Sequence, residues 1–444
     1  MSLPTEIYDL IIDELVAPGP DSGNTLTGRA LLDHRLALAS CLLVSHSFRE
    51  RSIRYLFKSV EIKGIGLHAL QPALLLITIL EGESRLNSSS MVPASHFVKE
   101  FHLAFEPECL KSSEVTTIFA TLLRLIWTRL EEGFGPTKFT VALPQSTWID
   151  IDPSLQKEIV SLVHSPHLRY LTIKGYSLIL PSLLYGSHIN TLSLTHMAFL
   201  MLPGLLDPGR IQPPRLTQFE CIGSSPDLGL PEIRDFFRTL FAELKSFRCI
   251  SAKRKKKTHL KLKQTHLEQI LELSANSLEE ISFNISSWRL NHIEDLGIMT
   301  NLQHIQLETE TGCKTIANLA NFFNVKTPLA MLHTISLAFK TVYAYSRNWH
   351  GRPPLFESKE NGQFLDQSLS SSKYPTLREV LIDVKLGYPE DFRIRSSPEE
   401  VRSAAMEEIY TLFPRLVAST RTKFIPTVTV YLALDCMLKF QLGY

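Results

Sequence analysis

One short segment has the spacing of a phosphate-binding turn. Gly64, Gly66 and Ala69 fit the pattern G-x-G-x-x-A, directly after a run that alternates like a strand. In dinucleotide-binding proteins such a turn brings backbone N–H groups close to a pyrophosphate. Pro72 would interrupt the following helix early, and no clear second strand ends in the acidic residue that binds the ribose. We therefore expect a simple glycine-rich turn here and no cofactor.

Histidines and cysteines are the other residues that could bind a metal or react as nucleophiles. His164 and His167 flank Pro166 without a further ligand close by, so we expect turn residues. The six cysteines lack Cys-x-x-Cys spacing, which favours buried, reduced thiols and no metal site. Gly-x-Ser-x-Gly, His-Glu-x-x-His and P-loop patterns are also absent from the sequence. The sequence therefore predicts a protein that is not an enzyme.

The chain contains one strongly basic run, Lys253–Lys257, with Lys261 and Lys263 beyond it. A solvated loop between two repeats is the favoured interpretation, a nuclear-import signal the second and a nucleic-acid patch the third, because no aromatic residues are interleaved. Lys plus Arg number 46 against 45 Asp plus Glu, so the net charge indicates neither nucleic acid nor an anionic membrane as a partner.

The composition is that of a folded protein in the cytoplasm or the nucleus. With 444 residues, of which 44% are hydrophobic, the chain can form one large core or two. Residues 1–16 contain no Lys or Arg and so lack the basic start of a secretory signal. The most apolar run, Ala69–Leu80, is shorter than the roughly 20 residues of a bilayer span. We therefore expect no transmembrane helix.

The first 62 residues contain three short stretches of helical spacing. The first should run from Pro4 to about Val16, because proline is tolerated in a first turn and apolar residues then recur at i, i+3, i+4 and i+8. Proline and glycine in residues 17–24 indicate a loop. Further helical spacing covers about 31–48 and 53–57, followed by a short strand at 60–62. Such short helices bury little surface alone, so they need a partner or the rest of the chain.

These helices resemble an F-box over residues 3–60. The most specific motifs are Leu3-Pro4-x-Glu6-Ile7 and the stretch from Leu43 to Arg49. The loop after Val16 is longer than in most F-boxes, and Phe48 stands where many members have Trp. The resemblance implies binding of a Skp-type adaptor and, through it, of a cullin-RING ubiquitin ligase. The apolar residues that it assigns to the adaptor or to the F-box interior are Leu3, Pro4, Ile7, Ile11, Leu36, Val44 and Phe48.

A second pattern, Leu-x-x-Leu-x-Leu with other apolar residues allowed, recurs beyond residue 160 and resembles the strand of leucine-rich repeats. The triplets are Leu168-Leu171-Ile173, Ile189-Leu192-Leu194, Leu216-Phe219-Cys221, Leu244-Phe247-Cys249, Leu278-Ile281-Phe283, Leu302-Ile305-Leu307, Leu332-Ile335-Leu337 and Leu377-Val380-Ile382, with weaker versions at 98–103 and 136–141. Helical spacing lies between triplets at 233–244 and 266–273. Alternating strands and helices predict a βα solenoid with a parallel sheet.

The sequence thus predicts an α/β chain with three regions. These are an F-box-like adaptor-binding segment at 1–62, a transition region with weak first repeats at 63–145, and a leucine-rich-repeat-like solenoid at 146–444. The solenoid should be irregular, because the asparagine that usually follows each triplet is missing. Ser, Gly, Pro and charged residues accumulate at 343–375, where we expect a long surface loop.

Residues between the apolar positions of each triplet should point away from the core, because side chains alternate along a strand. They are Tyr170, Thr172, Thr191, Ser193, Gln218, Glu220, Ser246, Arg248, Glu280, Ser282, His304, Gln306, Thr334 and Ser336. This face is the expected binding surface for a protein target. The resulting hypothesis is a non-catalytic substrate receptor of a ubiquitin ligase; the alternative is a repeat scaffold outside any ligase, whose F-box-like helices only cap the solenoid.

Overall fold

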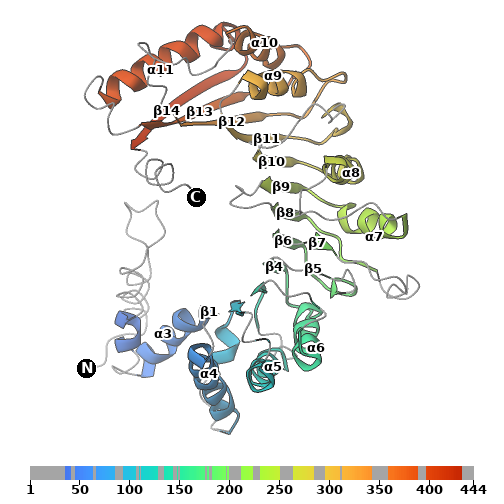
Figure 1. Cartoon of the computed structure of the whole chain (residues 1–444), viewed down its shortest axis with the longest axis vertical. Helices are drawn as coiled ribbons and strands as arrows, with labels where there is room; N and C mark the ends of the chain where they lie inside the picture. Colours follow the sequence, from blue (N-terminus) through green and yellow to red (C-terminus); the bar gives the residue numbers. More distant parts are fainter. Residues whose placement is uncertain are drawn as a thin grey trace. The chain divides into compact units, whose positions relative to one another are not determined.

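The protein is described by a computed structural model, shown in Figure 1. It describes residues 36–41, 46–63, 67–85, 94–106, 110, 112–128, 135–143, 148, 151–175, 178–179, 183–196, 198–199, 212–223, 231–250, 264–284, 296–310, 313–342, 359–388 and 397–432. The chain forms two compact units, Met1–Pro214 and Arg215–Tyr444. The region boundaries expected at residues 62 and 145 stay predictions.

The first unit is built on parallel strands. In spatial order they are β1 (Ser59–Lys63), β2 (Glu100–Ala104), β3 (Lys138–Ala142), β4 (Tyr170–Lys174) and β6 (Thr191–Thr195). A small separate sheet pairs β5 (Leu178–Ile179) with β7 (Ala198–Phe199). The expected strand at 60–62 is confirmed, and the two weaker triplets also form strands, β2 and β3.

Helices connect these strands, as parallel pairing requires. Between the strands lie α4 (Leu67–Arg85), the 3-10 turn η1 (Ala94–Phe97), α5 (Ser113–Thr128) and α6 (Pro153–Val163), whereas α3 (His46–Lys58) precedes β1. The Asp152 side chain caps α6 by accepting a hydrogen bond from the Ser154 amide at 2.9 Å. One expectation is corrected: Pro72 does not interrupt the helix, because it lies in the second turn of α4, where only one backbone bond is lost.

The second unit repeats this arrangement with longer strands towards its end. Its parallel strands are β8 (Gln218–Ile222), β9 (Ser246–Ile250), β10 (Glu280–Asn284), β11 (His304–Glu310), β12 (Thr334–Val342), β13 (Glu379–Tyr388) and β14 (Lys423–Leu432), in this order. Its helices are α7 (Pro231–Phe241), α8 (Gln264–Ser274), η7 (Leu296–Ile298), α9 (Cys313–Phe322), α10 (Lys359–Leu369), α11 (Pro398–Leu412) and α12 (Pro414–Val417). The helices expected at 233–244 and 266–273 are confirmed as α7 and α8.

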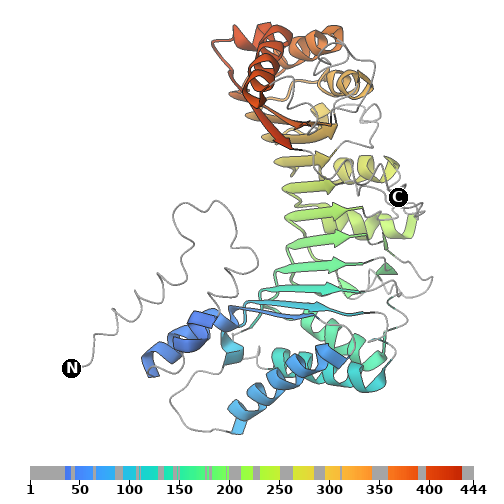
Figure 2. The same cartoon turned by 60° about the vertical axis from the view of Figure 1, so that its left-hand side comes forward.

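The triplets form the core of each unit. Equivalent residues stand opposite one another in the register, such as Leu171 and Leu192, and Phe219 and Phe247. The rings of Phe219 and Phe247 stack with centroids 5.7 Å apart, and both are buried. Each buried side chain of this size stabilises the fold by roughly 1.5–3 kcal/mol. The helices cover the core side of the strands, as Figures 1 and 2 show for α7 to α11.

The loop expected at 343–375 is partly wrong. Residues 359–369 form α10, whose Leu365 and Leu369 are fully buried, and Tyr374 beyond it is buried as well. The α/β class with parallel strands and covering helices is confirmed. Most of the expected F-box-like helices lie outside the described residues. Within the described part, residues 36–41 are helical, and α3 combines Phe48 with the piece expected at 53–57.

Candidate protein-binding face

The residues expected to point outward do so. Burial alternates along β4, β6, β8, β9 and β10, with the triplet residues buried and their neighbours partly or fully exposed. In β3, which one of the weaker triplets forms, Thr140 is buried as well. Tyr170 is the most apolar of the expected set and is 44% exposed. In the second unit, the described helices lie on the other side of the sheet, so none of them covers this face (Figure 2). Its role in target binding stays a prediction.

Polar side chains on this face pair with one another across strands. In the second unit, Arg248 lies 3.4 Å from Glu220, and the Ser246 hydroxyl donates to Glu280 at 3.3 Å. In the first unit, Glu100 on β2 lies 3.5 Å from the Lys138 ammonium on β3. Exposed pairs of this kind contribute about 0–1 kcal/mol. They order the surface without forming a site for chemistry.

An apolar patch on the second unit was missed from the sequence. Leu381 of β13 and Ile425 of β14 are direct neighbours in the register, and both are partly exposed. Leu381 points outward because Val380 and Ile382 on either side are fully buried. We call Leu381 and Ile425 the apolar patch. β14 carries no leucine triplet, and the expected outward residues did not include those of β13, although the alternation along the Leu377-Val380-Ile382 triplet places Leu381 on that face.

Charged and polar residues surround the apolar patch. Glu379 and Lys423 face each other on one side of it. On the other side, Asp383 accepts a hydrogen bond from the Thr427 hydroxyl at 2.9 Å and lies 3.5 Å from the Lys385 ammonium. An apolar centre with a polar rim is the usual anatomy of a protein–protein interface, in which a few central residues contribute most of the binding energy.

Two of the predicted adaptor-binding residues can be placed. Leu36 is 57% exposed, whereas its neighbour Leu38 is buried, and Phe48 in α3 is partly buried. Leu36 is therefore not part of the core that the described residues form. Leu3, Pro4, Ile7, Ile11 and Val44 lie outside the described residues. α3 packs on η1, where the Arg54 guanidinium lies 5.5 Å from the Phe97 ring centroid.

Histidines and acidic residues with possible chemistry can be placed where the structure describes them. No group of three or more His, Cys, Asp or Glu among the described residues could hold a metal ion. The His164 ring lies 3.3 Å from the Leu183 carbonyl, and burial lowers its pKa. His167 lies in the turn before β4, as expected.

Cys221 and Cys249 are buried thiols, as expected from the sequence. They are neighbours in the register of β8 and β9, and both are free. A hydrogen bond with Cys249 and burial raise the pKa of the Cys221 thiol well above its ordinary value. A thiol of this kind is a poor nucleophile, because the thiolate is the reactive form.

Other sequence candidates fall on parts of the chain that are not described. These are Gly64 and Gly66 of the glycine-rich turn and the basic run Lys253–Lys257. Among the described helices, none is long and apolar enough to cross a membrane.

No protein-family model matches the chain, and no curated protein matches it.

Proposed function

We propose that this chain is the substrate-recognition subunit of a Skp-cullin-F-box type ubiquitin ligase. In this function the N-terminal helices bind a Skp-type adaptor, and the open sheet face binds a protein target. The observation that carries the proposal is the apolar patch with its charged rim. It lies on a sheet face that the described helices do not cover, and residues 3–60 of the same chain contain the F-box-like motifs.

The chain needs no catalytic residues for this function. A receptor holds its target near the charged conjugating enzyme, which raises the effective concentration of target lysines without changing the bond chemistry. The polar surface around the patch suits recognition of one protein among many. A partner that does not match it would leave polar groups of the interface without hydrogen bonds and would therefore bind more weakly. Cytoplasm and nucleus are both compatible with this function.

Co-purification of the full-length chain with a Skp-type adaptor tests the proposal. We expect the wild-type chain to retain the adaptor and Leu36→Asp to lose most of it, because a charge would be placed at an apolar contact. Leu75→Asp is the matched control, since Leu75 on α4 is 63% exposed and lies outside the F-box-like motifs. Absence of adaptor from a soluble, folded wild-type chain would refute the proposal.

The scaffold alternative has one observation in its favour. β1 pairs with β2 along its whole length, and Ser52 in α3 is fully buried, so the N-terminal region is continuous with the core of the first unit. Terminal caps of this kind close an open repeat core. Under this alternative, the isolated chain is soluble without an adaptor, and Leu36→Asp changes no binding partner.

A further inference from the structure

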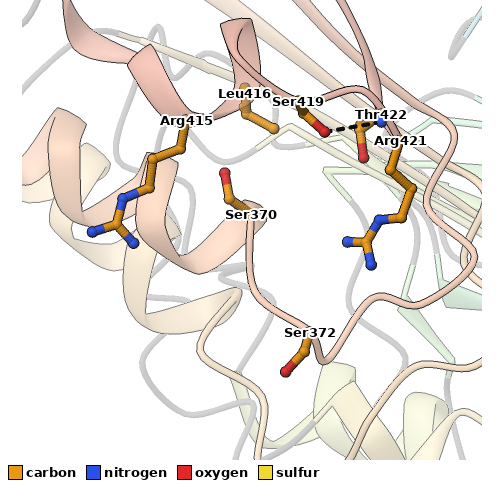
Figure 3. A pocket seen from close by; sticks show the side chains of 7 residues that line it. All are labelled: Ser370, Ser372, Arg415, Leu416, Ser419, Arg421 and Thr422. Carbon is orange, nitrogen blue, oxygen red and sulfur yellow. Dashed lines mark hydrogen bonds between the residues drawn. The ribbon is translucent and has the colours of Figure 1, made fainter.

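A pocket in the second unit lies away from the open sheet face, where α10, α12 and the start of β14 meet. It has a volume of about 390 Å³ and is lined by Ser370, Ser372, Arg415, Leu416, Ser419, Arg421 and Thr422. Arg415 and Arg421 stand on opposite sides of it, with Ser370 between them in the view of Figure 3. The volume is at the lower end of the roughly 300–1,000 Å³ typical of small-molecule sites.

The lining residues offer hydrogen-bond donors, and none of the seven carries a negatively charged carboxylate. The Ser419 hydroxyl oxygen accepts a hydrogen bond from the Thr422 amide at 3.0 Å, which leaves its own hydrogen available to a ligand. Both arginine side chains are exposed at the rim and can turn towards a ligand. Such a set of donors fits an oxyanion.

The Ser370 hydroxyl lies at the back of this pocket, where its oxygen is shielded from solvent. It interacts with the Asp366 carboxyl and lowers the pKa of that group as the smallest of several influences. A ligand oxygen in the pocket would offer this hydroxyl a second possible acceptor.

The nearest carboxylate is directed elsewhere. The oxygens of Asp366 accept hydrogen bonds from the backbone amides of Arg415 and Leu416 at 2.9 and 3.0 Å. These bonds hold Asp366 against the start of α12. The Arg415 guanidinium also attracts the Asp366 charge, so the lining brings two positive charges beside this one carboxylate.

We propose that this pocket binds the phosphate group of a small phosphate monoester. Two guanidinium groups match the charge of a phosphate dianion and can each donate two hydrogen bonds to it. The pocket is larger than a phosphate ion needs, so it leaves room for a small organic group. This site is independent of the apolar patch, and its test does not depend on a ligase function.

Calorimetric titration of the full-length chain tests the proposal, with glycerol 3-phosphate and inorganic phosphate as probes at constant ionic strength. We expect glycerol 3-phosphate to bind, and Arg415→Gln or Arg421→Gln to weaken its affinity about tenfold each, because one charge-assisted contact is lost. Ser370→Ala should weaken it several-fold. Arg402→Gln is the control, since Arg402 is an exposed arginine of α11 outside the pocket.

The outcomes separate the possible ligands. Equal binding of both probes, with the same dependence on the two arginines, would support the oxyanion site with free phosphate as its ligand. No binding of either probe to the wild-type chain would overturn the proposal. The same conclusion would follow if the Arg415→Gln/Arg421→Gln double variant bound as the wild type does, or if Arg402→Gln lost as much affinity as the pocket variants.

Discussion

At the scale of single residues, Tyr374 shows how a buried polar group connects two elements. Its ring is fully buried, and its hydroxyl donates a hydrogen bond to the Phe323 carbonyl at the end of α9. Tyr374→Phe leaves that carbonyl without its partner, so we expect the free energy of unfolding to fall by about 1–2 kcal/mol. Urea unfolding followed by circular dichroism measures the change. Tyr410→Phe, at an exposed position of α11, should change it by less than about 0.5 kcal/mol.

A second prediction at this scale concerns pH. Burial lowers the pKa of His164 below its ordinary value of 6.5, against an opposing effect of the Leu183 carbonyl, and the nearby His188 lowers it further. The unfolded chain therefore binds the proton more readily than the folded chain. The neutral ring contributes stability above pH 6.5, and this is lost as the pH falls through the lower, folded pKa. Burial also lowers the pKa of His196.

We expect the unfolding free energy to decrease between about pH 7 and pH 5, and His164→Gln to make this decrease smaller because one of the responsible groups is removed. Urea unfolding at several pH values measures it. His304→Gln, at an exposed position of the sheet face, serves as the control and should leave the slope as in the wild type. A slope that His164→Gln does not change would contradict the assignment to His164.

At the scale of elements, Gly175 fixes how closely β3 and β4 approach each other at their ends. It follows β4 with φ of +136°, and an added Cβ would lie 1.7 Å from the Leu143 carbonyl oxygen. That carbonyl belongs to the backbone, so it cannot move aside without breaking the strand pairing. We expect Gly175→Ala to destabilise the chain by at least about 2–3 kcal/mol in thermal unfolding.

Gly362→Ala provides the comparison. The added Cβ would lie 2.9 Å from the end of the flexible Leu412 side chain, which can turn away, and alanine favours the helix α10 by roughly 0.5–1 kcal/mol. This variant should therefore unfold within about 1 kcal/mol of the wild type. If both substitutions destabilised the chain equally, the contact with the Leu143 carbonyl would not be the cause of the loss of stability in Gly175→Ala.

Elements with a strong local pattern could be predicted from the sequence, and the others depend on tertiary contacts. The triplets predicted their strands because alternating burial needs apolar residues at fixed positions. α10 was missed because its residues are mostly polar, and only its packing buries Leu365 and Leu369. β14 was missed because its pattern contains Pro426, which is tolerated in a strand at the edge of the described sheet. Ile425 of the apolar patch was missed with it.

At the scale of the whole molecule, the proposed function assigns its two partners to different units. Leu36 belongs to the first unit, and the apolar patch of Leu381 and Ile425 belongs to the second. We expect Leu381→Ser/Ile425→Thr to lose target proteins and keep the adaptor, and Leu36→Asp to do the reverse. If the apolar patch is one of the few sites that dominate the interface, its loss weakens binding by about 2 kcal/mol, which is about thirtyfold in affinity. Threonine is suited to a strand, so the fold should remain.

Quantitative mass spectrometry of proteins co-purified with each full-length variant measures this separation. Arg402→Gln, at an exposed position of α11 outside the sheet face, is the control and should retain both partners. Each variant is compared with the wild-type chain. A co-purified protein counts as a target only if the Leu381→Ser/Ile425→Thr variant loses it while the control variant keeps it. Parallel loss of adaptor and target from both variants would mean that the two surfaces do not act independently. In that case the division of function between the two units would be wrong, even if the chain belongs to a ligase.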